Sequence, residues 1–197
     1  MNEIIESLYR RKSVRVFEDR SVPAEMKAAI LRSAAEAPTA GCQQLYTILD
    51  ITDQALKDAL AETCDHQSFI ARAPMVLVFC ADCKKWYDAY HEAGCDPRAP
   101  GVGDLMLAFS DAAIAAQNAV VAAESLGLGS CYIGDIMENC ARQRWGLGRI
   151  SSTRTPIAPW TGPSCGTCWP TTAGPDPSRS GARPSVSGST TPTFPGR

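Results

Sequence analysis

The chain has 197 residues, of which 45% are hydrophobic and 20% charged, and its formal net charge is -2. This length and composition indicate one soluble globular domain with a sizeable core. A charge this close to zero argues against a general nucleic-acid binder. Glu3 and Glu6 stand where a secretory signal would carry cations, and no apolar segment follows them. We therefore expect a cytoplasmic protein.

Two further features concern the membrane and the redox state. The most apolar stretch, residues 105–126, carries Asp111 and Glu124 together with two amide side chains, so we expect it not to span a bilayer. The nine cysteines are an odd number and are scattered along the chain. Because this is not typical of a disulfide framework, we expect most of them to be reduced.

In chain order, the first 140 residues indicate an α+β protein. The second helix is expected to begin with Pro23 and to stop at Pro38, and Gly127 is expected at the C′ position of a long alanine-rich helix. The apolar run before Lys84 is interpreted as a buried strand whose polar end includes Lys84, Lys85 and Trp86. The expected helices are 3–11, 24–37, 53–63 and 104–127, the expected strands are 45–51 and 75–81, and 130–136 is a short strand or turn.

The alanines of the long helix permit close approach of another backbone, so this helix is expected to be buried on more than one face. Two arrangements give the same pattern. One is a central core helix within one subunit, and the other is a helix at a dimer axis.

The composition changes after about Arg142. From there to the end the chain has seven arginines, a single acid (Asp176), no lysine, and many Ser, Thr, Pro and Gly residues. Such a segment buries too little apolar area to offset its chain entropy, so we expect a domain over 1–142 and a disordered tail over 143–197. Out-of-frame translation of a GC-rich gene gives a similar mixture, and our hypothesis is that the tail is frameshifted.

The stretch RRKSVRVF, residues 10–17, places four cations around Ser13. Arginine binds a phosphate through a two-pronged hydrogen bond, and a nearby hydroxyl adds another contact. Alternation along an extended segment would turn some of these side chains toward one site. The pattern fits a cradle for a phosphate monoester, although a solvated basic face has the same composition.

Two other segments have small residues where a ligand could approach the backbone. APTAGCQQLY, residues 37–46, ends a helix and offers exposed backbone N–H groups above a floor without large side chains. AAQNAVVAAESLGLGSCYIGDI, residues 115–136, ends a long helix in a glycine-rich turn. The first could hold a flat aromatic ligand, and the second lets a ligand approach its backbone closely. The alternative for each is a plain connection between elements, which is favoured for the first if it stands alone.

In this order and spacing, the three segments resemble the nitroreductase family of FMN-dependent oxidoreductases over about residues 4–140. The resemblance implies a mixed sheet flanked by helices and a homodimer with an FMN in each of two clefts between the subunits. It also implies that NAD(P)H delivers hydride to flavin N5, and that an electron-poor acceptor such as a nitroaromatic or a quinone then takes it by a ping-pong mechanism. No catalytic side-chain nucleophile and no metal are required.

Carried over by position, the resemblance also implies the flavin contacts. Arg11 and Ser13 would hold the phosphate, Lys12 would lie on the ribityl side, and Arg15 would stabilise negative charge at the pyrimidine edge of the reduced ring. The remaining contacts with the ring would be Pro38, Thr39 and Ala40 from the other subunit, Gln44 beside it, Gln67 near it, and Ile133 and Gly134 through their backbone on the N5 side.

The chain departs from the family pattern at three places. Cys42 stands where Asn is common, and Leu45 where Pro is common. After residue 142 the sequence has no counterpart of the carboxyl segment that, in the family, reaches the neighbouring subunit and adds basic residues near the phosphate. The resemblance thus implies a weakened dimer and an incomplete flavin site.

Two alternatives compete with a flavin enzyme. The first is an inactive remnant of the same family. The second is a zinc protein, because Cys80 and Cys83 form one C-x-x-C pair and Cys165 and Cys168 form another, and tetrahedral zinc takes four thiolates from two such pairs. Cys80 lies in an apolar strand and the second pair in a segment without a folding pattern, which disfavours zinc.

Overall fold

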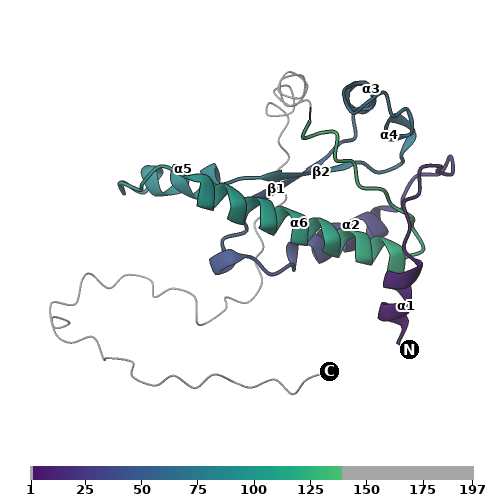
Figure 1. Ribbon diagram of the computed structural model, residues 1–197, viewed down its shortest axis with the longest axis horizontal. Helices are drawn as coiled ribbons and strands as arrows, with labels where there is room; N and C mark the ends of the chain where they lie inside the picture. The colour runs from purple at the N-terminus through teal and green to yellow at the C-terminus, as the bar shows by residue number, and fades with distance from the viewer. Residues whose placement is uncertain (1, 139–197) are drawn as a thin grey trace, which may run out of the picture. The chain divides into compact units, whose positions relative to one another are not determined.

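The computed structural model describes residues 2–138, and its elements follow the expected order (Figure 1). The expected tail over 143–197, with its frameshift hypothesis and the Cys165–Cys168 pair, lies outside the described residues. The elements are α1 (Glu3–Arg10), α2 (Ala24–Ala35), the 3-10 turn η1 (Ala40–Cys42), β1 (Tyr46–Asp50), α3 (Gln54–Thr63), α4 (Phe69–Arg72), β2 (Leu77–Ala81), α5 (Lys84–Glu92) and α6 (Val102–Ser125).

The sheet consists of β1 and β2, which pair antiparallel with Tyr46 opposite Ala81 and Asp50 opposite Leu77. A separate parallel bridge joins Ser13 to Ser130. The predicted α+β class is therefore confirmed, and both directions of strand pairing occur among residues 2–138.

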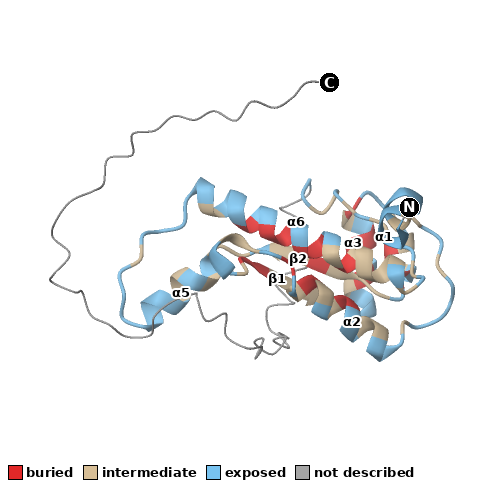
Figure 2. Ribbon diagram, turned by 90° about the horizontal axis from the view of Figure 1, so that it is seen from below, coloured by how far each residue is buried: buried red, intermediate tan, exposed pale blue. Residues whose placement is uncertain are grey.

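The alanine-rich helix α6 packs against α2 and against both strands (Figure 1). Its buried residues are Ala108, Asp111, Ala112, Ala115, Ala116 and Ala119, and they form one stripe along the helix (Figure 2). The other face is exposed and apolar at its N-terminal end, where Leu105 is 51%, Met106 66% and Phe109 54% exposed. Among residues 2–138, α6 is thus a core helix on one face only.

A second cluster of buried side chains lies between α3, α4 and the sheet and includes Ile51, Leu60, Ile70 and Val78. Ile133 and Ile136 pack against it, and this contact holds the 130–136 segment in place. Truncating a buried leucine such as Leu60 to alanine costs roughly 2–5 kcal/mol in comparable cores. The segment that follows α6 is therefore fixed by the main core of the domain.

The end of α6 is set by Gly127, as predicted. Its φ of +79° is left-handed, the Gly127 N–H donates to the carbonyl of Glu124 (3.0 Å), and the Leu128 N–H donates to that of Ala123 (2.9 Å). This pair of bonds is the Schellman motif, which turns the chain back on itself. The turn brings Ser130 beside the N-terminal segment.

Two predictions about the elements need correction, and one short helix has no predicted counterpart. Lys84, Lys85 and Trp86 do not end a strand but begin α5, because β2 stops at Ala81 and the Asp82 carboxylate then accepts the Lys85 N–H (3.1 Å). The short helix α4 was not predicted. Pro23 is the N-cap of α2 rather than its first helical residue.

By length and composition alone, α6 could also cross a membrane, with a mean hydropathy of 1.5 over its most apolar part. It passes this test although it carries Asp104, Asp111 and Glu124, so composition does not support the expectation that the stretch is too polar to span a bilayer. Core helices of soluble proteins pass the same test, and α6 has one buried stripe against α2 and the sheet.

Candidate functional site

The N-terminal basic segment lies beside the turn that follows α6. Besides the bridge between Ser13 and Ser130, the Val14 N–H donates to the Ser130 carbonyl (2.9 Å). Bridge partners face the same side of a sheet, and so do alternate residues along each strand. This geometry puts Arg11 and Ser13 on one face with Ser130 and Tyr132. We call these four residues the N-terminal cluster.

Two polar atoms of the N-terminal cluster are buried without a hydrogen-bond partner among residues 2–138: Arg11 Nη1 and Ser130 Oγ. Burial raises the pKa of the Tyr132 phenol, and the charge of Arg11 acts in the opposite direction. An unpaired buried guanidinium nitrogen is costly. A bound anion would supply the missing acceptor.

The turn after α6 and the N-terminal segment pack closely together where Gly129 meets the Val14 side chain. A Cβ placed on Gly129 would lie 2.6 Å from Val14 Cγ2, a distance that real side chains do not reach. Only glycine therefore allows the turn after α6 to approach the N-terminal segment this closely.

Arg15, Gln67 and Gly134 lie next to the N-terminal cluster. The Arg15 guanidinium is 5.9 Å from the centre of the Phe69 ring at the start of α4. Two residues before Phe69, Gln67 Nε2 donates to Asp135 Oδ2 (2.7 Å), which ties this loop to Gly134. Gln67 follows two residues with left-handed backbone, Asp65 (φ 57°) and His66 (φ 54°), a strained arrangement that is common near functional sites.

The 38–44 turn is held from behind by a buried carboxylate on α6. Asp111, 2% exposed, accepts the Ala40 N–H through Oδ1 (3.0 Å) and the Leu45 N–H through Oδ2 (3.2 Å). Thr39 Oγ1 accepts the Gln44 N–H (3.2 Å). Gly41, Cys42 and Gln44 all have left-handed backbone, so these contacts stabilise a conformation that the turn would not favour alone.

Helix α5 holds the other side of the same turn. Lys85 Nζ donates to the carbonyls of Gln44 (2.6 Å) and Tyr46 (3.0 Å), and Trp86 Nε1 donates to that of Gln43 (2.7 Å). Burial lowers the pKa of Lys85, while Asp82 and Asp111 raise it. The backbone of the turn is thus bonded on its inner side, while Pro38, Gly41 and Cys42 stay exposed.

The sequence-predicted site residues fall into two groups. The first group lies together near the C-terminal end of α6 and comprises Arg11, Lys12, Ser13, Arg15, Gln67, Ile133 and Gly134. The second group, Pro38, Thr39, Ala40 and Gln44, lies beside Asp111. Tyr132 of the N-terminal cluster donates to Gln117 Oε1 (3.3 Å), and Gln117 is six residues from Asp111 on α6, or about 9 Å at the rise of an α-helix.

The structure adds residues that the sequence did not single out. Ser130 and Asp135 sit in a turn expected only to offer backbone, and neither spacing nor charge signals their contacts. Asp111 was read as a polar interruption of an apolar stretch. A buried acid on a helix face that is otherwise alanine is the signal that could have identified it.

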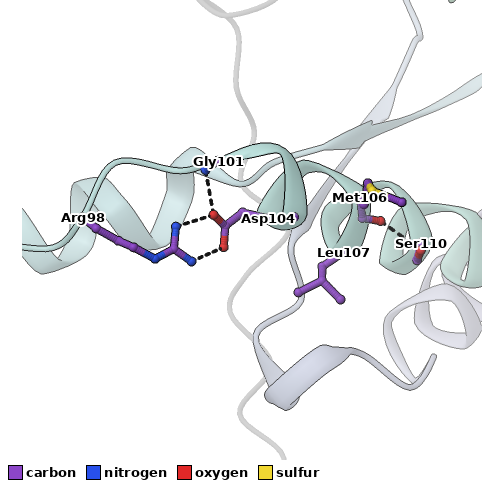
Figure 3. A pocket seen from close by; sticks show the side chains of 7 residues that line it. Arg98, Gly101, Asp104, Met106, Leu107 and Ser110 are labelled. Carbon is purple, nitrogen blue, oxygen red and sulfur yellow. Dashed lines mark hydrogen bonds and ion pairs between the residues drawn. The ribbon is translucent and has the colours of Figure 1, made fainter.

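A shallow hollow of about 610 Å³ lies at the N-terminal end of α6 and contains none of the predicted site residues (Figure 3). Arg98 and Asp104 face each other there through two hydrogen bonds of 2.6 and 2.8 Å. Hydrogen bonding to Arg98 lowers the pKa of Asp104 to about 2. Arg98 and Asp104 thus satisfy each other's charge.

The zinc alternative has no support within residues 2–138, where no three His, Cys, Asp or Glu side chains gather closely enough to hold a metal. Of the described pair, Cys80 packs against the second core cluster, which gives it a structural role. The other pair, Cys165 and Cys168, is outside the described residues.

Comparisons with known proteins give one consistent family. The chain is 37% identical over 140 residues to the oxygen-insensitive NADPH nitroreductase of Salmonella typhimurium, covering 71% of this chain and 56% of the relative. It is 34% identical over 143 residues to the FMN reductase (NADPH) of Bacillus subtilis, covering 69% and 55%. The chain therefore spans about half the length of the curated relatives it matches.

Solved structures agree with these relatives. The NfrA1 nitroreductase of B. subtilis superposes with a TM-score of 0.71 at 32% identity, covering 74% of this chain and 60% of that one. The NADPH:FMN oxidoreductase of Vibrio harveyi, solved with NAD+, gives 0.68 at 29% identity, covering 75% and 62%. A sequence model of the nitroreductase family matches residues 8–151. The chain belongs to the nitroreductase family.

Proposed function

We propose that this protein is an FMN-dependent oxidoreductase that passes hydride from NAD(P)H to an electron-poor small molecule, such as a nitroaromatic or a quinone, in the cytoplasm. Family membership and the names of the relatives in Salmonella and Bacillus support this assignment. The observation that carries it is the buried, unpaired Nη1 of Arg11 in the N-terminal cluster.

The N-terminal cluster fits the phosphate of FMN. A phosphate monoester brings several strong acceptor oxygens, and Arg11 Nη1 and Ser130 Oγ are two buried polar atoms with no partner among residues 2–138. Ser13 and the exposed ammonium of Lys12 lie next to them and would complete the cradle. Riboflavin, which lacks the phosphate, would leave Arg11 unpaired.

The ring would extend from this cradle toward Arg15, Gln67, Ile133 and Gly134. When bound, FMN supplies the hydride chemistry at its N5 atom. Arg15 would stabilise the negative charge that the reduced ring gains at its pyrimidine edge. The backbone of Ile133 and Gly134 would position the ring, and the exposed Gly134 leaves room for its close approach. The protein therefore binds and orients, without a side-chain nucleophile.

The second group of site residues would come from a second copy of the chain. The 38–44 turn is held at Asp111, whereas Tyr132 of the N-terminal cluster contacts α6 at Gln117 (3.3 Å). The exposed small residues of the turn would line the flavin of a partner. The exposed apolar face of α6 at Leu105, Met106 and Phe109 is a surface of the kind that pairs in homodimers. We propose a homodimer with two shared flavin sites.

The visible spectrum tests this function. Purified protein is mixed with excess FMN, desalted, and scanned, then supplied with NADPH or NADH and a quinone. We expect a yellow protein that retains flavin and oxidises the nicotinamide. A folded, colourless protein after desalting would contradict the proposal and would favour the inactive remnant.

A further inference from the structure

We propose that Asp111 is a positioning residue for the flavin: its carboxylate, on α6, holds the 38–44 turn in the shape that meets the ring bound by the other subunit. This inference rests on the proposed function and adds to it a residue that touches neither cofactor nor substrate.

The composition of the buried face of α6 indicates that Asp111 stabilises the turn rather than the helix. Every other buried position of α6 is alanine, and Asp111 alone is ionisable. A buried carboxylate is costly unless hydrogen bonds compensate for its lost hydration. Both of its oxygens are compensated by the turn, at Ala40 (3.0 Å) and Leu45 (3.2 Å).

The two bonds fix the distance between the ends of a strained loop. Ala40 and Leu45 flank Gly41, Cys42 and Gln44, the three residues with left-handed backbone. Non-glycine residues in this conformation revert to others unless the surroundings hold them. Because the Asp111 carboxylate accepts a hydrogen bond near each end of this loop, it stabilises the loop conformation. These hydrogen bonds lie on the buried side of the turn, so the exposed Pro38 and Gly41 face outward, where a flat ligand could approach.

A merely structural role predicts a different result from a positioning role. If Asp111 only stabilised the fold, its loss would lower the melting temperature like any other core change, and the folded fraction would bind flavin normally. If it shapes the turn, the folded protein itself would bind flavin less tightly and would shield the ring less well.

The experiment compares Asp111→Asn and Asp111→Ala with the wild type. Asn keeps the size but has one acceptor oxygen, and its NH₂ group faces a backbone N–H; Ala has no acceptor. FMN affinity is measured by fluorescence quenching well below the melting temperature. We expect the FMN Kd to rise about ten-fold in Asp111→Asn and further in Asp111→Ala. Bound FMN should also be less quenched in both variants.

Two matched controls separate positioning from stability. Asp104→Asn makes the same chemical change on the same helix, away from the turn. Ala119→Gly weakens the same buried face at a position that packs on α2 instead. Both should bind FMN as the wild type does, even where Ala119→Gly melts earlier.

The outcomes are distinguishable. A wild type that binds no FMN contradicts the proposed function itself. A wild type that binds FMN, with Asp111 variants that bind it equally well and quench it equally, overturns the positioning role, as does an affinity order that follows melting temperature. Either Asp111 variant decides the question if the other does not fold.

Discussion

Gly129 and Val14 approach so closely that a methyl group on the glycine would lie 2.6 Å from Val14 Cγ2. This contact joins the turn after α6 to the basic N-terminal segment, where the Val14 N–H donates to the Ser130 carbonyl (2.9 Å). Because Gly129 has no side chain, the two segments that carry the N-terminal cluster can lie this close together.

Gly129→Ala should separate these two segments. We expect a loss of about 1–3 kcal/mol in the free energy of unfolding, from overpacking and the broken hydrogen bond, together with weaker FMN binding. Urea unfolding and an FMN titration measure the two effects. In the control, Gly103→Ala, the added Cβ meets nothing within 4 Å and lies in a helix, so stability should hold or rise. Equal stability of Gly129→Ala and wild type would show that the close approach is unimportant.

Arg11→Met should remove the phosphate grip without harming the fold. The buried, unpaired Nη1 destabilises the flavin-free protein, so the melting temperature of the flavin-free Arg11→Met variant should not fall below that of the wild type. FMN affinity should drop at least about ten-fold, as for a lost charge-assisted hydrogen bond, while riboflavin affinity stays unchanged. Calorimetric titrations with both flavins check this. Arg10→Met, one residue away and exposed, is the control. Parallel losses for both flavins would argue against a phosphate contact.

The secondary structure was largely predictable because local signals set it. Gly127 ended α6, and the apolar period fixed α2 and α3 within a few residues. Helix α5 was missed because its first turn depends on the Asp82 side chain accepting the Lys85 N–H, a contact that composition does not reveal. Long-range contacts leave no local signal. Asp111 bonds to Ala40, 71 residues away in the chain, so its role emerged only from the structure.

Phe109→Glu should break the proposed dimer. Phe109 is 54% exposed on the apolar face of α6, and a carboxylate there would have to be desolvated between two subunits. We expect a monomer by light scattering and a loss of retained FMN, because the 38–44 turn of a partner would no longer reach the flavin. Arg32→Glu, on the exposed side of α2, adds negative charge without touching this face. A monomeric variant that still retains FMN would place the whole site within one chain.

The Arg98–Asp104 pair makes a pH-dependent contribution to stability. Its geometry lowers the pKa of Asp104 to about 2 in the folded protein, below the ordinary value of 3.8. A depressed carboxyl pKa stabilises the fold above the unfolded pKa and loses that effect as pH falls toward 2. Because the pair is solvent-exposed, the effect should be small and weaker in high salt. Melting temperatures of wild type and Asp104→Asn should differ slightly at pH 6 and converge near pH 2. A difference in melting temperature that increases as the pH falls would refute this prediction.

Arg11, Ser13, Arg15, Gln67 and Gly134 lie on neighbouring segments of the structure, and their contact with a flavin stays a prediction. What the sequence did not reveal is that Ser130 faces Ser13 across a bridge, because serine in a glycine-rich turn has no distinctive pattern.

The most direct test of the whole account is a titration of the wild-type protein with FMN and, separately, with riboflavin. The account predicts one FMN bound per chain, with riboflavin at least about ten-fold weaker because Arg11 then lacks its anion. Equal affinity for the two flavins, or no binding of either by a protein whose residues 2–138 are folded, would contradict it.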